Sequence, residues 1–263
     1  MYKKKINIVA YDSNWVNIFK IHANELKNKL KENCVEVYHV GSTSVPELCA
    51  KPIVDMMCVV KDLNIASQKL SELGYKCKGE FNLPLRLFFQ RKTPNDVHIH
   101  VVKENSGEIA WNLVFQDYLR KNEEAREMYA KTKLDLIKEN PDGFKIIPGL
   151  FSEYTIKKGE CIKKIAKRAG FSDYRFVIVA NYDEISEYKK LMNVREINFD
   201  DENMYHLCLY KGVEIVAAAC VKFDASNSIA TIISIVSTND KDKDMLKYKI
   251  KEWVEFHNLS LAK

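Results

Sequence analysis

The sequence predicts two α+β domains in one chain of 263 residues. Apolar runs of strand length alternate with stretches of helical spacing on both sides of a segment near residue 170. The composition is globular, with 46% hydrophobic and 29% charged residues. No apolar run reaches the roughly 20 residues that a membrane span needs. We therefore expect domains at 1–169 and 172–263 and no membrane association.

The first domain alternates helices and strands. Trp15, Phe19, His22 and Leu26 have helical spacing, which predicts an amphipathic helix. Two apolar strands follow it, CVEVYHVG and PIVDMMCVVK, with a polar loop between them. Ser152 is expected to cap the last helix of this domain. The remaining expected elements are a helix near 62–73, strands at 75–81, 85–92 and 96–103, and helices at 107–139 and 152–169.

The boundary is expected at RAGFSDYR, residues 168–175, where Gly170 ends a helix and the charge balance changes sign. From Ser172 onward there are 12 Lys and Arg against 15 Asp and Glu. Residues 1–171 contain the other 29 Lys and Arg and the other 21 Asp and Glu. The second domain is expected to have a strand at 174–180, a helix at 182–193, strands at 204–212, 213–224 and 228–238, and a helix at 242–257.

The charge balance indicates where a ligand could bind, and the cysteines indicate the cellular compartment. The basic first domain is the place to expect a phosphate-bearing ligand, although such an excess also serves solubility. Seven scattered cysteines without a CxxC pair favour free thiols in a reducing compartment. We expect a cytoplasmic protein.

A Gly-Ser turn and one strand acid carry the chemical hypothesis. After Gly41, a turn can aim backbone N–H groups and the hydroxyls of Ser42 and Ser44 at an anion. Twelve residues separate Ser42 from Asp55, an acid inside an apolar strand where a charge is costly without a partner. This spacing resembles the nucleotidyltransferase signature, in which Gly-Ser holds the triphosphate and two strand acids hold magnesium.

Five separated blocks extend the resemblance over residues 5–168. They are INIVAYDSNWVNIF, YHVGSTSVPELCAKPIVDM, VHIHVV, FQDYLRKN and SEYTIKKGECI. In this order they resemble the GrpB family, which implies a reduced nucleotidyltransferase fold with a mixed sheet flanked by helices. Glu47 stands where the family usually has glycine. The matching positions are His39, Gly41, Ser42, Ser44, Pro46, Lys51, Pro52, Asp55, His98, His100, Asp117, Arg120, Tyr154 and Lys158.

The metal ligands of the full enzymes are incomplete here. A second acid two residues after Asp55 would share its face of the strand, but Met57 stands there and cannot bind a hard cation. His98 and His100 share one strand face, and with Asp55 they form a candidate site for zinc, manganese or iron rather than magnesium. This weakens the case for magnesium-dependent nucleotidyl transfer, although a divalent metal, including magnesium, stays an expected cofactor.

Each of these residues also has a structural interpretation. Asp55 would then cap a neighbouring turn, and the two histidines would be half-buried and hydrogen-bonded. Lys51 and Arg120 would be surface charges. Tyr154 is expected to pack in the core, with Lys158 one helical turn below it.

The second domain resembles the front half of the GNAT acyltransferase fold in its order of elements. The segment corresponding to the pyrophosphate-binding loop reads NDKDKDML, with no glycine and with Asp240, Asp242 and Asp244. Without glycine the backbone cannot come close to a bound pyrophosphate, and the negative charge of the aspartates would repel a polyanion. We expect a degenerate or interaction module.

Four functions follow from these patterns. In the first, Gly41, Ser42, Ser44, Lys51, Arg120 and Lys158 bind a nucleotide or other phosphorylated small molecule, while Asp55, His98 and His100 bind a metal and catalyse transfer. In the second, the same fold is a non-catalytic sensor that signals to a protein partner through the second domain. The third is acyl transfer by the second domain. The fourth, nucleic acid binding, lacks a basic stripe interleaved with aromatics.

Overall fold

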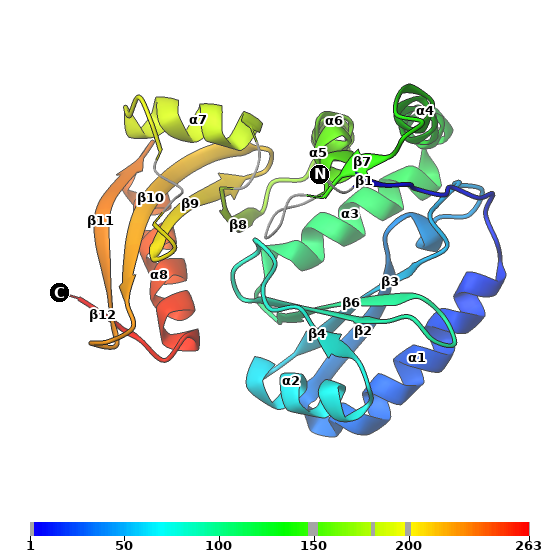
Figure 1. Cartoon of the computed structure of the whole chain (residues 1–263), viewed down its shortest axis with the longest axis horizontal. Coiled ribbons are helices and arrows are strands. Elements are labelled where there is room, and N and C mark those ends of the chain that lie inside the picture. The colour runs from blue at the N-terminus through cyan, green and yellow to red at the C-terminus, as the bar shows by residue number, and fades with distance from the viewer. Residues whose placement is uncertain (1–2, 147–151, 180–181, 198–200, 263) are drawn as a thin grey trace. The chain divides into compact units, whose positions relative to one another are not determined.

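A computed structural model describes residues 3–146, 152–179, 182–197 and 201–262. The chain forms two compact units (Figure 1). The N-terminal unit contains residues 1–81 and 86–171, and the C-terminal unit contains residues 82–85 and 172–263. Among the described residues, no helix combines the length and apolar composition that crossing a bilayer requires.

A five-stranded mixed sheet forms the centre of the N-terminal unit. Its order is β2-β3-β6-β5-β4. The central pair β3 and β6 is parallel, and the other neighbours are antiparallel. This confirms the predicted α+β class with a mixed sheet. The strands are β2 (Cys34–Val40), β3 (Val54–Val60), β4 (Lys76–Cys77), β5 (Arg86–Arg91) and β6 (Val97–Lys103).

Helices cover both faces of this sheet (Figure 1). Met57 and Val59 of β3 share a buried cluster with Ile109 of α3, whereas Met56 and Cys58 are buried on the other face. Asp55 has the same strand parity as Met57 and therefore lies on the α3 face. The helices are α1 (Asn14–Leu30), α2 (Leu63–Glu72), α3 (Gly107–Lys121), α4 (Glu123–Glu139), α5 (Glu153–Lys157) and α6 (Gly159–Arg168).

Two of the expected helices are each divided in two. Asn122 has extended backbone angles, and its side chain accepts a hydrogen bond from Ala125 N at 2.8 Å. The expected helix at 107–139 was therefore wrong at this point, because an N-cap asparagine starts a new helix there. Ser152 caps α5 as predicted. Lys158 marks the junction between α5 and α6.

A small two-stranded sheet ties the chain start to the segment after α4. Its strands are β1 (Lys3–Lys4) and β7 (Phe144–Lys145), which the sequence did not predict because each has only two residues. Gly143 has φ +93°, and a Cβ atom on it would lie 2.7 Å from the Lys4 backbone. Glycine is therefore required for this close approach.

The C-terminal unit has a second five-stranded sheet, of order β12-β11-β10-β9-β8. One buried cluster, around Trp253 of α8, packs on one set of strand residues, and another, around Tyr188 of α7, packs on the alternate set. The elements are β8 (Tyr174–Ile178), α7 (Tyr182–Met192), β9 (Met204–Lys211), β10 (Glu214–Asp224), β11 (Ile229–Ser237), α8 (Asp240–Phe256) and β12 (Ser260–Leu261). The short strand β12 pairs in parallel with β11 and was not predicted.

Candidate functional site

The turn after β2 lies against the Asp55 carboxylate. Val40, the last residue of β2, pairs with Asp55 on β3, and Gly41 beside it has φ +71°. A Cβ atom on Gly41 would lie 2.7 Å from Asp55 Oδ2. The backbone conformation and the lack of space both require glycine. The short 3-10 helix η2 (Ser42–Ser44) then begins with Ser42, which lines a pocket.

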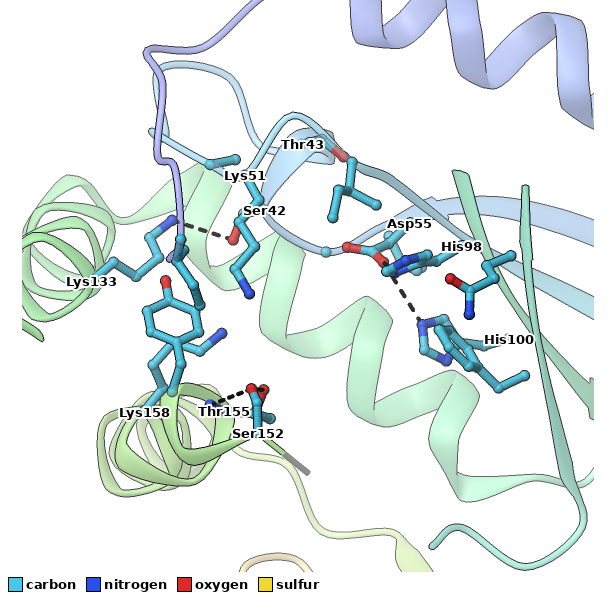
Figure 2. Close-up of a pocket in the computed structure, with 18 of the residues that line it drawn as sticks. Ser42, Thr43, Lys51, Asp55, His98, His100, Lys133, Ser152, Thr155 and Lys158 are labelled. Carbon is cyan, nitrogen blue, oxygen red and sulfur yellow. Dashed lines mark hydrogen bonds and ion pairs between the residues drawn. The ribbon is translucent and has the colours of Figure 1, made fainter. Parts of the chain in front are cut away.

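Asp55, His98 and His100 lie together on one side of this pocket (Figure 2). Asp55 is the register partner of His98 across β3 and β6. His98 Nδ1 lies 3.3 Å and His100 Nε2 3.9 Å from Asp55 Oδ1. Phe88 packs against both imidazoles, with ring centroids 5.0 and 5.3 Å away. The strand spacing predicts this convergence.

The two imidazoles favour the ionised form of Asp55. Burial alone raises the pKa of Asp55, but the hydrogen bonds from His100 and His98 outweigh it and hold that pKa well below its usual range. Burial lowers the pKa of His100, although its hydrogen bond to Asp55 acts in the opposite direction. The site therefore contains one carboxylate anion with imidazole N–H groups directed at it.

Arg86, which the sequence patterns did not single out, contacts the second nitrogen of His100. It is 3% exposed, and its Nη1 lies 2.7 Å from His100 Nδ1. Its Nε and Nη2 donate to the Glu80 carbonyl at 3.2 and 2.8 Å, and Nη2 also donates to the Phe81 carbonyl at 2.8 Å. Burial lowers the pKa of Arg86 to about 10, so the guanidinium is still a cation at neutral pH.

Three lysine amines gather at the other end of the pocket (Figure 2). Lys133 Nζ donates to Ser42 Oγ at 3.3 Å and to the Cys49 carbonyl. Lys51 comes from the loop before β3, and Lys158 from the junction of α5 and α6. Burial lowers the pKa of each of the three lysines to about 8. Their charges are poorly solvated, and a bound anion would stabilise them.

Tyr154 lies beside two of these lysines. Its ring centroid is 4.3 Å from Lys51 Nζ and 4.5 Å from Lys158 Nζ. The residue is 1% exposed, as expected for a core side chain. It also lines the pocket, and its hydroxyl has no hydrogen-bond partner among the described residues. Because buried hydroxyls are nearly always hydrogen-bonded, this group is a candidate donor to a ligand.

Ser44 and Arg120, two of the predicted ligand-binding residues, are not among the described residues that line the pocket. Ser44 Oγ lies 2.8 Å from the Gly41 carbonyl oxygen and 3.0 Å from Gln116 Oε1, and its single proton can be donated to either acceptor. Arg120 Nη2 donates to the Ser44 carbonyl at 2.9 Å, and its Nη1 pairs with Asp117. In this structure both side chains hold the Gly-Ser turn in place.

The pocket has a volume of about 640 Å³, within the usual range for small-molecule sites. Among its described lining residues, Asp55 is the only carboxylate. The cations that line it are Lys4, Lys51, Arg86, Lys133 and Lys158. The apolar side chains that line it are Ile6, Ile8, Val40, Ala50, Ile53, Phe81, Phe88, Phe144 and Ile146.

Lys133 was not among the predicted site residues, although its position in the sequence could have indicated it. The buried residues of α4 are Ala125, Tyr129 and Lys133, spaced four residues apart. A lysine on the apolar stripe of a helix is costly unless a polar site receives its amine. That placement, rather than the overall charge, identifies it as a site residue.

The predicted metal site stays a prediction. Asp55, His98 and His100 are close to one another, but no group of three or more His, Cys, Asp or Glu side chains in the described part of the chain has the arrangement of a metal site. A histidine that binds metal through one nitrogen usually donates a hydrogen bond from the other. His100 Nδ1 faces the Arg86 donor instead, which argues against His100 as a ligand.

Comparisons with known proteins agree with the motif blocks. The UPF0157 protein YqkA of Bacillus subtilis is 30% identical over 171 residues, which cover 64% of this chain and 48% of YqkA. The chain therefore matches about half the length of that relative. UPF0157 protein BH1888 of Halalkalibacterium halodurans is 31% identical over 62% of this chain and 82% of its own length.

A solved structure matches a similar share of the chain. The crystal structure of conserved protein GrpB from Enterococcus faecalis has a TM-score of 0.54 and 35% sequence identity, and the match covers 62% of this chain and 96% of that chain. The family model described as GrpB protein matches residues 5–168, which contain every described residue of the pocket except Lys4. The chain belongs to the GrpB family.

Proposed function

We propose that the N-terminal unit binds the phosphoryl end of a nucleotide or of another phosphorylated small molecule. The observation that carries this proposal is the charge of the pocket, where five lysine and arginine side chains face a single carboxylate among the described lining residues. Lys4 is exposed, whereas Lys51, Arg86, Lys133 and Lys158 are partly or fully buried. Such an excess of positive charge is costly in an empty site and favourable around an anion.

The lining of the pocket suits both the phosphoryl and the organic part of such a ligand. Ser42 and the three lysines supply donors for phosphate oxygens. Phe81 and Ile146, which are 38% and 39% exposed, line the pocket as well and offer apolar surface to an organic group. Specific polar groups in a largely apolar cleft are typical of small-molecule sites.

Transfer of the bound group is the second candidate, and the contact between His98 and Asp55 favours it. A histidine with one ring nitrogen at 3.3 Å from a carboxylate has the arrangement of a general base. In this role, His98 would accept a proton from an attacking hydroxyl while Asp55 orients the ring. Without such a step the same pocket serves as a sensor.

A thermal-shift screen of phosphorylated compounds, followed by calorimetric titration of each stabilising compound, tests the binding proposal. Lys133→Met is expected to weaken binding by at least about tenfold, because it removes a charged donor at a buried site. Lys20→Met is the matched control, since it deletes the same charge from an exposed position on α1. Equal affinities of the two variants would contradict the proposed site.

A further inference from the structure

The partner of His100 decides which of its nitrogens has a free lone pair. Arg86 Nη1, at 2.7 Å from His100 Nδ1, is always a donor, so Nδ1 accepts. The proton of the neutral ring is then on Nε2, the nitrogen that faces Asp55. A metal ion would need a lone pair there.

Arg86 is also held firmly in this position. It also donates hydrogen bonds to the carbonyls of Glu80 and Phe81, its guanidinium carbon lies 5.4 Å from the centroid of the Phe88 ring, and its side chain is buried beside the pocket. A divalent cation at Asp55 would therefore lie near a fixed guanidinium, with the three lysines in the same pocket. Like charges in a poorly solvated pocket repel strongly.

The lysines of the pocket supply the positive charge that a metal ion otherwise supplies to a bound phosphate. Among the described residues, Lys51, Lys133 and Lys158 make no ion pair with a carboxylate, so their charge is available to a ligand. Lys51 and Lys158 contact the same ring of Tyr154, whose buried hydroxyl has no described partner. Ammonium groups and a phenol are hard donors that match phosphate oxygens.

From this arrangement we infer that the pocket holds a phosphate or diphosphate group directly, with Lys51, Lys133, Lys158 and the Tyr154 hydroxyl in place of a divalent metal ion. This inference rests on the proposed function and specifies its ligand chemistry. Asp55 serves as the acceptor for His98 and His100 and does not bind a cation. Tyr154 is a binding residue in addition to its place in the core.

Calorimetric titration of the metal-stripped full chain with inorganic pyrophosphate tests the inference. The titration is run with EDTA, with Mg²⁺ and with Mn²⁺ at equal ionic strength. We expect affinities that agree within about threefold, since the lysines neutralise the ligand. Binding that needs Mg²⁺ or Mn²⁺ would overturn the inference and leave the proposed function standing. Absence of saturable binding in all three buffers would overturn both.

Tyr154→Phe is the sharpest variant because it removes one oxygen that has no described protein partner. We expect pyrophosphate to bind at least about tenfold more weakly to this variant, with the thermal midpoint of the free protein unchanged or higher. Unchanged affinity in Tyr154→Phe would overturn the assignment of this residue. Lys20→Met is again the control for an exposed charge.

Discussion

Gly41 and Asp55 show how single residues set the geometry of the pocket. The glycine has a left-handed backbone and leaves no room for a Cβ atom beside Asp55 Oδ2. The period of the strands placed Asp55, His98 and His100 on one face, so their convergence was predictable. Arg86 was not predicted, because its significance depends on burial that only the folded chain reveals. Lys133 was not predicted either, although its place on the apolar stripe of a helix could have indicated it.

Gly41→Ala is expected to destabilise the protein by roughly 2–3 kcal/mol, because a left-handed alanine is strained and its Cβ displaces the Asp55 carboxylate. Gly74→Ala is a matched control, since Gly74 also has positive φ, +81°, but has no atom within 4 Å of the added Cβ. That variant should lose only about 1 kcal/mol. Chemical denaturation measures both, and equal losses would show that contact with Asp55 does not matter.

Lys158 gives a prediction that depends on pH. Burial lowers its pKa from 10.5 to about 8 in the folded chain, so between these values the unfolded chain binds more protons. Stability therefore rises with pH across that window, and the penalty is fully present below pH 8. After allowance for solvent screening, Lys158→Met should stabilise the free protein by roughly 1–2 kcal/mol at neutral pH.

Thermal melting of both proteins at neutral pH and above pH 10 checks this prediction, since the advantage of the variant should shrink at the higher pH. The same variant should bind phosphorylated ligands more weakly, which would show that the amine is kept for binding at a cost in stability. A variant that is less stable than the natural protein at neutral pH would contradict this account.

At the scale of elements, the prediction of helices and strands depended on clear periodicity and on recognising the residues that cap each helix. The long strands and helices carry clear periodicity and appear near their predicted positions. Asn122 was not recognised as a cap, so one helix was expected where α3 and α4 lie. β1, β7 and β12 have two residues each, which is too short for any periodic pattern, and the strand expected at 75–81 is present only as the two-residue β4. Their pairing is set by tertiary contacts.

The start of α8 satisfies its own backbone groups. Asn239 accepts from Asp242 N at 3.0 Å, and the buried Asp242 carboxylate accepts from Tyr174 and Asn239, each at 2.6 Å. Asn239 is therefore the N-cap residue of α8, and its side-chain amide also donates to the Asp242 carboxylate. Asp242 is therefore part of the helix cap, while Asp240 and Asp244 are exposed. The resemblance to acyltransferases stays a prediction.

We expect the C-terminal unit not to bind acetyl-CoA, because the carboxylates of Asp240, Asp242 and Asp244 in the first turns of α8 would repel a pyrophosphate group there. Calorimetric titration of the full chain should show no saturable binding that survives the combined substitution of Lys51, Lys133 and Lys158 by methionine. The triple variant is used because it prevents acetyl-CoA from binding through the N-terminal pocket. Saturable binding in that variant would restore acyl transfer as a candidate.

At the scale of the whole molecule, the chain does not divide at a single point. Residues 82–85 belong to the C-terminal unit, although they lie between β4 and β5 in the sequence. Leu83 and Leu85 pack against the two buried clusters of that unit, and Ile178 N donates to the Asn82 carbonyl at 3.2 Å. Composition and charge predict a boundary near residue 170, but no local pattern reveals this inserted segment.

A fragment of residues 1–171 is expected to melt cooperatively, because it retains the complete mixed sheet and its helices. It should aggregate more readily than the full chain, since Leu83 and Leu85 lose their apolar neighbours. Substituting both by serine should improve the solubility of the fragment but destabilise the full chain by at least about 2 kcal/mol. A non-cooperative transition of the serine fragment would show that the C-terminal unit is required for folding.

The central claim is that a phosphoryl group binds between the lysines and Tyr154, beside the Gly-Ser turn. A crystal structure of the full chain grown with inorganic pyrophosphate and EDTA tests it most directly. The account predicts phosphate oxygens within hydrogen-bond distance of Lys51, Lys133 and Lys158 Nζ and of the Tyr154 hydroxyl, with no metal at Asp55. Pyrophosphate bound elsewhere, or bound here only through a metal held by Asp55 and the two histidines, would contradict it.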